Sequence, residues 1–188
     1  MLNQTNLKLR ISGGEKKRSL IYVPENVRPT KNIVKQALFS IVESKIKGAV
    51  CADIFCGSGS LGLEALSRGA KFCVFIDSQN KSVEATIKNI KKLNYQNKSK
   101  VYLKSAENFL KGNTQKFDII FLDPPYKKRI DNILPNLLKS IKLNGIVVYL
   151  HGANTKLPEN VNILTQRKFG KTVITIFGKN GSTKKKNK

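Results

Sequence analysis

One stretch decides the fold: Asp53-Ile54-Phe55-Cys56-Gly57-Ser58-Gly59-Ser60-Leu61-Gly62. An apolar, β-rich run here ends in closely spaced glycines, which allow a backbone to turn tightly and approach a ligand without an obstructing Cβ. The spacing of Gly57, Gly59 and Gly62 matches the G-x-G-x-x-G pattern of a strand-to-helix turn that binds a nucleotide-like cofactor. On its own, the pattern also permits a turn that serves only helix–sheet packing.

Short apolar runs alternate with helical patterns around this turn. We expect strands at residues 50–55, 72–76, 101–103, 117–122 and 146–150, with helices near residues 60–68, 80–93, 106–111 and 130–142. Strands that are apolar on both faces and joined by helices are typical of a parallel sheet covered on both sides. The sequence therefore predicts a Rossmann-like α/β fold.

The two ends of the chain predict antiparallel hairpins. Residues 162–168 and 172–177 are β-rich and lie too close together for a crossover helix, so they should pair directly. The same holds near the amino terminus for residues 7–11 and 20–23. The expected divisions are a basic hairpin extension at 1–29, a Rossmann-like domain at 30–178 and a disordered basic tail at 179–188.

Charge indicates the class of partner. The net charge is +23, from 35 Lys and Arg against 12 Asp and Glu, which favours a polyanion. Residues 1–50 carry ten basic and three acidic side chains, and residues 151–188 carry nine basic side chains against Glu159 alone. No apolar run in the sequence approaches the roughly 18 residues of a membrane span, and the polar start lacks a signal peptide's apolar core. We expect a cytoplasmic protein with no membrane partner.

The cysteines and the histidine do not suggest a metal site. Cys51, Cys56 and Cys73 form neither a disulfide framework nor a zinc pattern, and we expect reduced core residues. The single His151 has no second histidine with which to build a metal centre, so a structural or surface role is expected and no metal is assigned.

Several residues outside the glycines are placed to bind a cofactor. Asp77 follows the second strand, 20 residues after Gly57, where a carboxylate can accept hydrogen bonds from a ribose hydroxyl. The Asp53 carboxylate can interact either with a cofactor ammonium group or with helix amides. Ser105 begins the helix after the third strand. These features fit a dinucleotide or S-adenosylmethionine, and the chain is too short for the catalytic domain that dehydrogenases usually add. The candidate cofactor-binding residues are Asp53, Phe55, Gly57, Ser58, Gly59, Asp77, Ser105 and Ala106.

A second motif, Asp123-Pro124-Pro125-Tyr126, follows the strand at residues 117–122, at the sheet edge where open α/β folds bind ligands. The two prolines have no backbone N–H, so this segment offers carbonyl acceptors without competing donors, which suits an amino group. The exocyclic amine of a base is a poor nucleophile because its lone pair is delocalised. Acceptance of its N–H groups by the Asp123 carboxylate and the Pro124 carbonyl would aim that lone pair at a sulfonium methyl group.

The Tyr126 ring would stack on the same base. The motif thus predicts a methyltransferase that uses S-adenosylmethionine and modifies an exocyclic amino nitrogen of a nucleic-acid base, with Asp123, Pro124 and Tyr126 as catalytic candidates. A base inside a duplex cannot reach such a site, so the target should be single-stranded, looped or flipped out.

The chain resembles the ribosomal RNA small subunit methyltransferase D family, bacterial guanine-N2 methyltransferases of 16S rRNA. Arg28-Pro29-Thr30 and the helix after it resemble the family's helix entry, residues 55–70 are nearly its consensus, and residues 117–126 match its Asp-Pro-Pro-Tyr segment. Three positions depart from the pattern: Cys56 replaces a usual Ala, Asp77 a usual Glu, and His151 a usual acidic residue.

The resemblance implies a class I S-adenosylmethionine-dependent methyltransferase fold with a seven-stranded, mostly parallel sheet, a C-terminal antiparallel hairpin and an N-terminal β-hairpin. It also implies S-adenosylmethionine as donor, N2-methylguanine as product, and 16S rRNA within an assembling 30S subunit as the partner. A monomer is expected, although the sequence does not determine the oligomeric state. The substrate-binding candidates are Pro125, Lys16, Lys17, Arg18, Arg28 and Thr30, with the hairpin cations contacting phosphates without reading sequence.

Two other classes remain open. A DNA or RNA methyltransferase acting on adenine N6 or cytosine N4 uses a similar motif, although such DNA enzymes generally carry a target-recognition domain for which this chain has no obvious candidate. A non-catalytic RNA-binding assembly factor would fit the charge, but the intact glycine turn and the intact segment from Asp123 to Tyr126 argue against it.

Overall fold

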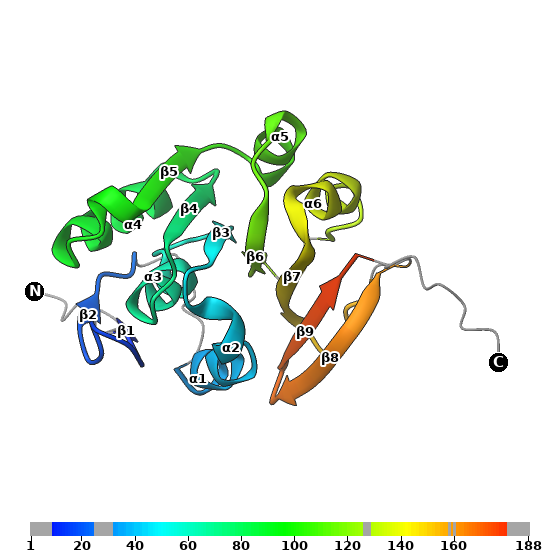
Figure 1. Ribbon diagram of the computed structural model, residues 1–188, viewed down its shortest axis with the longest axis horizontal. Coiled ribbons are helices and arrows are strands. Elements are labelled where there is room, and N and C mark those ends of the chain that lie inside the picture. The colour runs from blue at the N-terminus through cyan, green and yellow to red at the C-terminus, as the bar shows by residue number, and fades with distance from the viewer. Residues whose placement is uncertain (1–8, 25–31, 126–128, 158, 160, 180–188) are drawn as a thin grey trace, which may run out of the picture.

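The computed structural model describes residues 9–24, 32–125, 129–157, 159 and 161–179. Arg28, Thr30 and Tyr126 lie outside these residues. A seven-stranded sheet has the strand order β5-β4-β3-β6-β7-β9-β8 (Figure 1). Its strands are β3 (Val50–Ile54), β4 (Phe72–Asp77), β5 (Ser99–Leu103), β6 (Phe117–Leu122), β7 (Ile141–Gly152), β8 (Asn162–Phe169) and β9 (Thr172–Gly178). Strands β3 to β7 are parallel, and β9 and β8 are antiparallel, as the sequence predicts.

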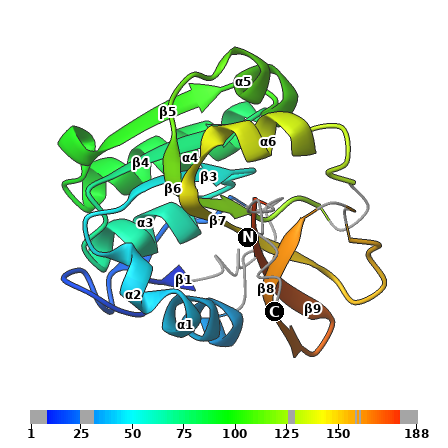
Figure 2. The same cartoon turned by 45° about the vertical axis from the view of Figure 1, so that its right-hand side comes forward.

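Helices cover both faces of the sheet (Figure 2). They are α1 (Asn32–Ile41), α2 (Glu43–Ile46), α3 (Ser60–Ser67), α4 (Asn80–Lys92), α5 (Ala106–Gly112) and α6 (Leu134–Ser140), with a 3₁₀ turn η1 (Gln96–Lys98). Apolar residues of α1, α3 and α4 pack on one face and those of α5 and α6 on the other. No helix in the described part of the chain is long and apolar enough to cross a bilayer. Cys51, Cys56 and Cys73 are buried free thiols, which confirms the prediction.

Both boundaries of one predicted helix are wrong. The helix expected at residues 130–142 is limited to Leu134–Ser140, and Ile141 already belongs to β7, where it pairs with Phe117. Pro135 lies in the first turn of α6, where its missing N–H costs no hydrogen bond, so the helix begins there. The register of β6 and β7 then shifts between Phe117 and Ile119, which lets β7 start early without losing its pairing farther along.

Strands β1 (Leu9–Arg10) and β2 (Leu20–Ile21) form a separate antiparallel pair. This hairpin packs on α3: the Glu15 amide donates to the Ser67 carbonyl at 2.8 Å, and the Ser67 hydroxyl donates to the Gly13 carbonyl at 2.6 Å. Gly14 permits this contact, because a Cβ there would lie 1.8 Å from the Ser67 oxygen. Four apolar hairpin residues, Leu9, Ile11, Ile21 and Val23, join the α3 side of the core.

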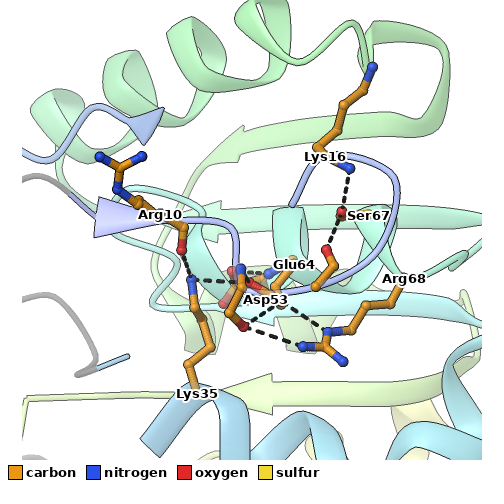
Figure 3. A network of polar contacts seen from close by, with 10 residues as sticks. Arg10, Lys16, Lys35, Asp53, Glu64, Ser67 and Arg68 are labelled. Carbon is orange, nitrogen blue, oxygen red and sulfur yellow. Dashed lines mark hydrogen bonds and ion pairs between the residues drawn. The ribbon is translucent and has the colours of Figure 1, made fainter. Parts of the chain in front are cut away.

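A buried polar network ties α1, α3 and the hairpin together (Figure 3). The Glu64 carboxylate accepts hydrogen bonds from the Ser12 amide at 2.8 Å, the Ser12 hydroxyl at 2.7 Å and Arg68 Nε at 2.9 Å. Lys35 Nζ lies 3.1 Å from Glu64 and donates to the Arg10 carbonyl. Burial lowers the pKa of Lys35. The pKa of Glu64 also lies below its ordinary value, because the Lys35 charge and these hydrogen bonds outweigh the opposing effect of burial.

Candidate active site

Three acidic residues gather at the carboxyl edge of the sheet. Asp53 is the penultimate residue of β3, Asp77 ends β4, and Asp123 directly follows β6. The parallel register pairs Asp53 with both Phe75 on β4 and Phe121 on β6, so the three carboxylates meet at one edge. Sequence reasoning selected all three residues, and the strand pairing brings them together.

The three carboxylates interact electrostatically. Asp53 is only 1% exposed, and burial raises its pKa well above the usual range. The charges of Asp123 and Asp77 raise this pKa further, although a 2.8 Å hydrogen bond from the Gly62 amide opposes the shift. A quarter of the twelve acidic residues of a strongly cationic chain thus lie at one site. Such mutual repulsion is relieved when a cationic group binds between carboxylates.

The turn after β3 has an unusual backbone. Phe55, Gly57 and Gly59 all adopt left-handed φ values, of 63°, 55° and 77°. Glycine takes this conformation freely, whereas a residue with a Cβ does so at a cost of about 1–2 kcal/mol. Strained residues of this kind cluster at ligand-binding sites, and Phe55 is one of the residues predicted to bind the cofactor.

Asp77 holds the glycine turn against β4. One carboxylate oxygen accepts the Gly57 amide at 2.9 Å and the other accepts the Gln79 amide at 2.9 Å. Each carboxylate oxygen has a second lone pair, so both remain able to accept a ligand hydroxyl. The carbonyl of Asp77 also accepts the Lys104 amide at 2.9 Å, which brings the end of β5 to the same edge.

Two residues of α4 that the sequence analysis did not select form hydrogen bonds to this turn. The Thr86 hydroxyl donates to the Gly57 carbonyl at 3.0 Å, and the Asn89 amide donates to the Ser58 carbonyl at 2.9 Å. Both side chains are fully buried. The sequence did contain a signal for their role: two polar residues lie three positions apart on the apolar face of an amphipathic helix. Polar residues at buried positions need hydrogen-bond partners, which the turn provides here.

Gly62 serves packing rather than the turn. A Cβ at this position would lie 2.3 Å from the Phe75 ring and 2.6 Å from Cys73 Sγ, so α3 could not approach β4 as closely. The G-x-G-x-x-G pattern therefore combines two roles: Gly57 and Gly59 shape the turn, and Gly62 allows the helix to contact the sheet.

The remaining cofactor candidates lie at the start of α5. Ser105 caps this helix by accepting the Asn108 amide at 3.1 Å, and Ala106 is buried in its first turn. Their placement directly after Lys104, which is bonded to Asp77, puts them at the same sheet edge as the glycine turn.

The Asp-Pro-Pro segment leaves β6 toward this edge. Asp123 is partly exposed, Pro124 is buried and Pro125 is exposed. The Asp123 charge raises the pKa of Asp53, so the two carboxylates are close enough to repel each other and the second motif lies beside the glycine turn.

The hairpin cations lie elsewhere. Lys16 is bonded through its amide to the Ser67 hydroxyl at 3.0 Å, and Ser67 ends α3 at the amino edge of the sheet, where β4 begins. Because β4 spans six residues, this edge lies roughly 20 Å from Asp77 at about 3.3 Å per residue. The fold therefore does not bring Lys16, Lys17 or Arg18 together with Asp123.

Comparison with known proteins identifies the family. A family model described as conserved hypothetical protein 95 matches residues 9–178. Ribosomal RNA small subunit methyltransferase D of Buchnera aphidicola subsp. Acyrthosiphon pisum is 37% identical over 142 residues, which cover 73% of this chain and 74% of the relative. The chain belongs to the ribosomal RNA small subunit methyltransferase D family.

Two further proteins are similar to this chain over greater lengths. The Bacillus subtilis protein YlbH is 35% identical over 91% of this chain and 98% of its own length. The solved structure of the Escherichia coli protein yhhF superimposes with a TM-score of 0.80 and 27% identity, covering 92% of this chain and 98% of that one. The expected class I S-adenosylmethionine-dependent methyltransferase fold is confirmed.

His151 has a structural position in this member of the ribosomal RNA small subunit methyltransferase D family. Its Nδ1 lies 2.8 Å from the Gly152 carbonyl, which can only accept, so Nδ1 carries the proton. Its Nε2 then accepts the Thr175 hydroxyl at 2.8 Å, and Gln166 donates to the same hydroxyl oxygen at 3.0 Å. Burial lowers the pKa of His151. The neutral imidazole thus links β7 to β9 and β8.

Proposed function

We propose that the protein transfers a methyl group from S-adenosylmethionine to the exocyclic N2 of a guanine in 16S rRNA, acting as a cytoplasmic monomer on an assembling 30S subunit. The observation that carries this proposal is the meeting of Asp123 and Pro124 with Asp53, Asp77 and the glycine turn at one sheet edge. Membership of the ribosomal RNA small subunit methyltransferase D family supports the guanine and the RNA.

The residues at this edge fit S-adenosylmethionine. When bound, that cofactor supplies an electrophilic methyl group and leaves as S-adenosylhomocysteine. Its sulfonium and ammonium groups are positive, which suits a site where the charges of Asp77 and Asp123 both repel that of Asp53. Asp77 would bind the ribose, Asp53 the ammonium group directly or through the turn, and Ser105 and Ala106 the adenine. Phe55, Gly57, Ser58 and Gly59 would shape the backbone around the cofactor.

Asp123 and Pro124 would hold the target amine. The Asp123 carboxylate and the Pro124 carbonyl each accept one N–H of the amino group, which favours a pyramidal nitrogen with its lone pair free for the methyl group. Asp123 or water takes the proton that the nitrogen loses. Tyr126 would stack on the guanine and Pro125 would contact it, while Arg28 and Thr30 would bind the adjoining RNA.

Transfer of radiolabelled methyl groups tests the reaction. We would compare 30S particles from cells lacking the enzyme, naked 16S rRNA and duplex DNA, and then locate the modified nucleotide by mass spectrometry. The proposal expects label in 30S particles as N2-methylguanine at one position. Label in DNA alone, or as N6-methyladenine or N4-methylcytosine, would identify the other kind of amino-methyltransferase. RNA binding with no transfer to any of the three would leave an assembly factor.

A further inference from the structure

We propose that a second RNA-binding surface lies at the amino edge of the sheet, on the last turns of α4 and on η1, continuous with the hairpin loop. We call it the α4 basic face and define it by Lys88, Lys91, Lys92 and Lys98. It would bind backbone phosphates of the substrate RNA far from the reacting base. This inference rests on the proposed function for the identity of the RNA.

The charge in this part of the chain is entirely of one sign. Residues 85–106 contain six lysines and no aspartate or glutamate. Lys88, Lys91 and Lys92 are spaced three and four positions apart near the end of α4, so they lie on one side of the helix, and all are exposed. Lys98 is exposed one turn farther along the chain.

Aromatic contacts show that these lysines and the hairpin form one surface. The Nζ atoms of Lys16 and Lys98 lie 6.0 and 5.9 Å from the centre of the Tyr95 ring, so a hairpin cation and an η1 cation meet there. Lys88 Nζ lies 4.4 Å from the centre of the Tyr22 ring, which follows β2. Such contacts restrict flexible lysine side chains and leave their N–H groups available to an anion.

Hydrogen bonds between the Asn89 side chain and the Tyr22 backbone hold the two segments together. The Tyr22 amide donates to the Asn89 side chain at 2.7 Å, and the Asn89 side chain donates to the Tyr22 carbonyl at 2.8 Å. Asn89 is fully buried between two of the lysines of the α4 basic face. The segment after the hairpin is therefore anchored to α4, which fixes the relative positions of Tyr22 and Lys88.

In the part of the chain that the structure describes, no recorded ion pair involves Lys88, Lys91, Lys92 or Lys98, although Glu84 lies four positions before Lys88 and Glu15 interacts with Tyr95. The ion pairs recorded among the described residues use other lysines, Lys35, Lys142 and Lys156. Exposed lysines spread over a helix face are suited to a phosphate backbone, where each contact releases a condensed counterion. Asn94, Gln96 and Asn97, which are exposed between Lys92 and Lys98, can donate to phosphates or 2′-hydroxyls.

The location decides what this surface contributes. The hairpin loop meets Ser67 and Tyr95 at the amino edge of the sheet, roughly 20 Å from Asp77 across the length of β4. A phosphate bound there cannot contact the reacting amine. The surface should therefore raise the affinity for a large folded RNA without changing the chemical step.

The test compares two triple variants. Lys88→Gln/Lys91→Gln/Lys92→Gln removes the α4 charges, and Lys139→Gln/Lys168→Gln/Lys171→Gln removes three exposed charges on α6 and the β8–β9 hairpin. We expect the α4 variant to raise KM for unmethylated 30S particles at least about tenfold with kcat and S-adenosylmethionine affinity within about twofold. The slope of log K against log salt for a short RNA duplex should fall by about 3 in magnitude. In the control variant, KM should change by less than about twofold and the slope by less than about 1.

The duplex measurement separates this inference from the proposed function. If the wild-type protein methylates no RNA, a loss of salt dependence confined to the α4 variant still supports the surface, and equal slopes in the two variants overturn it. Equal increases in KM for the two variants would also overturn it. A loss of binding to anionic phospholipid vesicles without a loss of RNA binding would assign the face to a membrane and reject the RNA.

Discussion

The Nζ atom of Lys35 lies 3.1 Å from Oε2 of Glu64, and neither side chain is exposed to solvent. The pair connects α1 to the helix that follows the glycine turn. A buried ion pair offsets its desolvation only where hydrogen bonds satisfy the remaining polar atoms, as Ser12, Arg68 and the Arg10 carbonyl do here.

Loss of one partner of this pair should destabilise the protein. Glu64→Gln leaves Lys35 as an uncompensated buried charge, and we expect the free energy of unfolding to fall by about 3–5 kcal/mol in urea denaturation. The control is Glu159→Gln, because Glu159 and Lys156 form an exposed pair at 3.5 Å, and no measurable change is expected there. Similar decreases in the free energy of unfolding of the two variants would show that burial does not set the strength of the Lys35–Glu64 contact.

Asp123→Ala should abolish the chemistry and preserve the fold. Without an acceptor for one N–H of the target amine, kcat should fall by about 10²–10³-fold while RNA binding is retained. Asp118→Asn is the matched control on the same strand: Asp118 pairs with Lys142 at 2.8 Å and accepts the Val50 amide, so its loss should lower stability and leave kcat unchanged. Single-turnover methylation measures the rate of methyl transfer in both variants, and urea denaturation measures their stability. Full turnover by Asp123→Ala would remove this residue from the mechanism.

The glycines of the turn should separate by phenotype. Gly59→Ala places a Cβ at φ 77°, 3.1 Å from Thr86, so it should distort the turn and weaken S-adenosylmethionine binding about tenfold, equivalent to about 1.4 kcal/mol. Gly62→Ala overpacks the α3–β4 contact and should cost about 1–3 kcal/mol of stability with the affinity nearly unchanged. Titration calorimetry measures the affinity for S-adenosylmethionine, and thermal unfolding measures the stability. Gly170→Ala, with open space around its Cβ, controls for backbone strain alone.

His151 should make stability depend on pH. Because its folded pKa lies below the unfolded value of 6.5, the folded state binds fewer protons, and this contribution to stability is present above pH 6.5 and lost as pH falls through the folded pKa. The stability advantage of wild type over His151→Gln should therefore shrink by up to about 1.4 kcal/mol per pH unit as the pH falls below 6.5.

The imidazole signal can be followed by NMR without assignment, since His151 is the single histidine of the chain. A titration midpoint above 6.5 would contradict the buried, neutral ring and its proton on Nδ1.

Much of the α/β fold followed from patterns within short segments. The glycine turn, both hairpins and the Asp123-Pro124-Pro125 segment depend on backbone freedom, on proline chemistry and on alternation over a few residues, and all of these are local properties. The end of the predicted helix at residue 142 was wrong because Ile141 is held by its pairing with Phe117, which no local pattern reports.

The sequence by itself determined that this chain has a glycine turn, an Asp-Pro-Pro-Tyr segment and an excess of positive charge. Only the tertiary structure decided where these features lie. Parallel register placed Asp53, Asp77 and Asp123 at one edge, and the contact of the hairpin with Ser67 placed Lys16 at the other. Thr86, Asn89 and Glu64 acquired their roles from partners more than 25 residues away in sequence. The physical reason is that hydrogen bonds and ion pairs of buried groups depend on which segments pack together, and packing is a property of the whole chain.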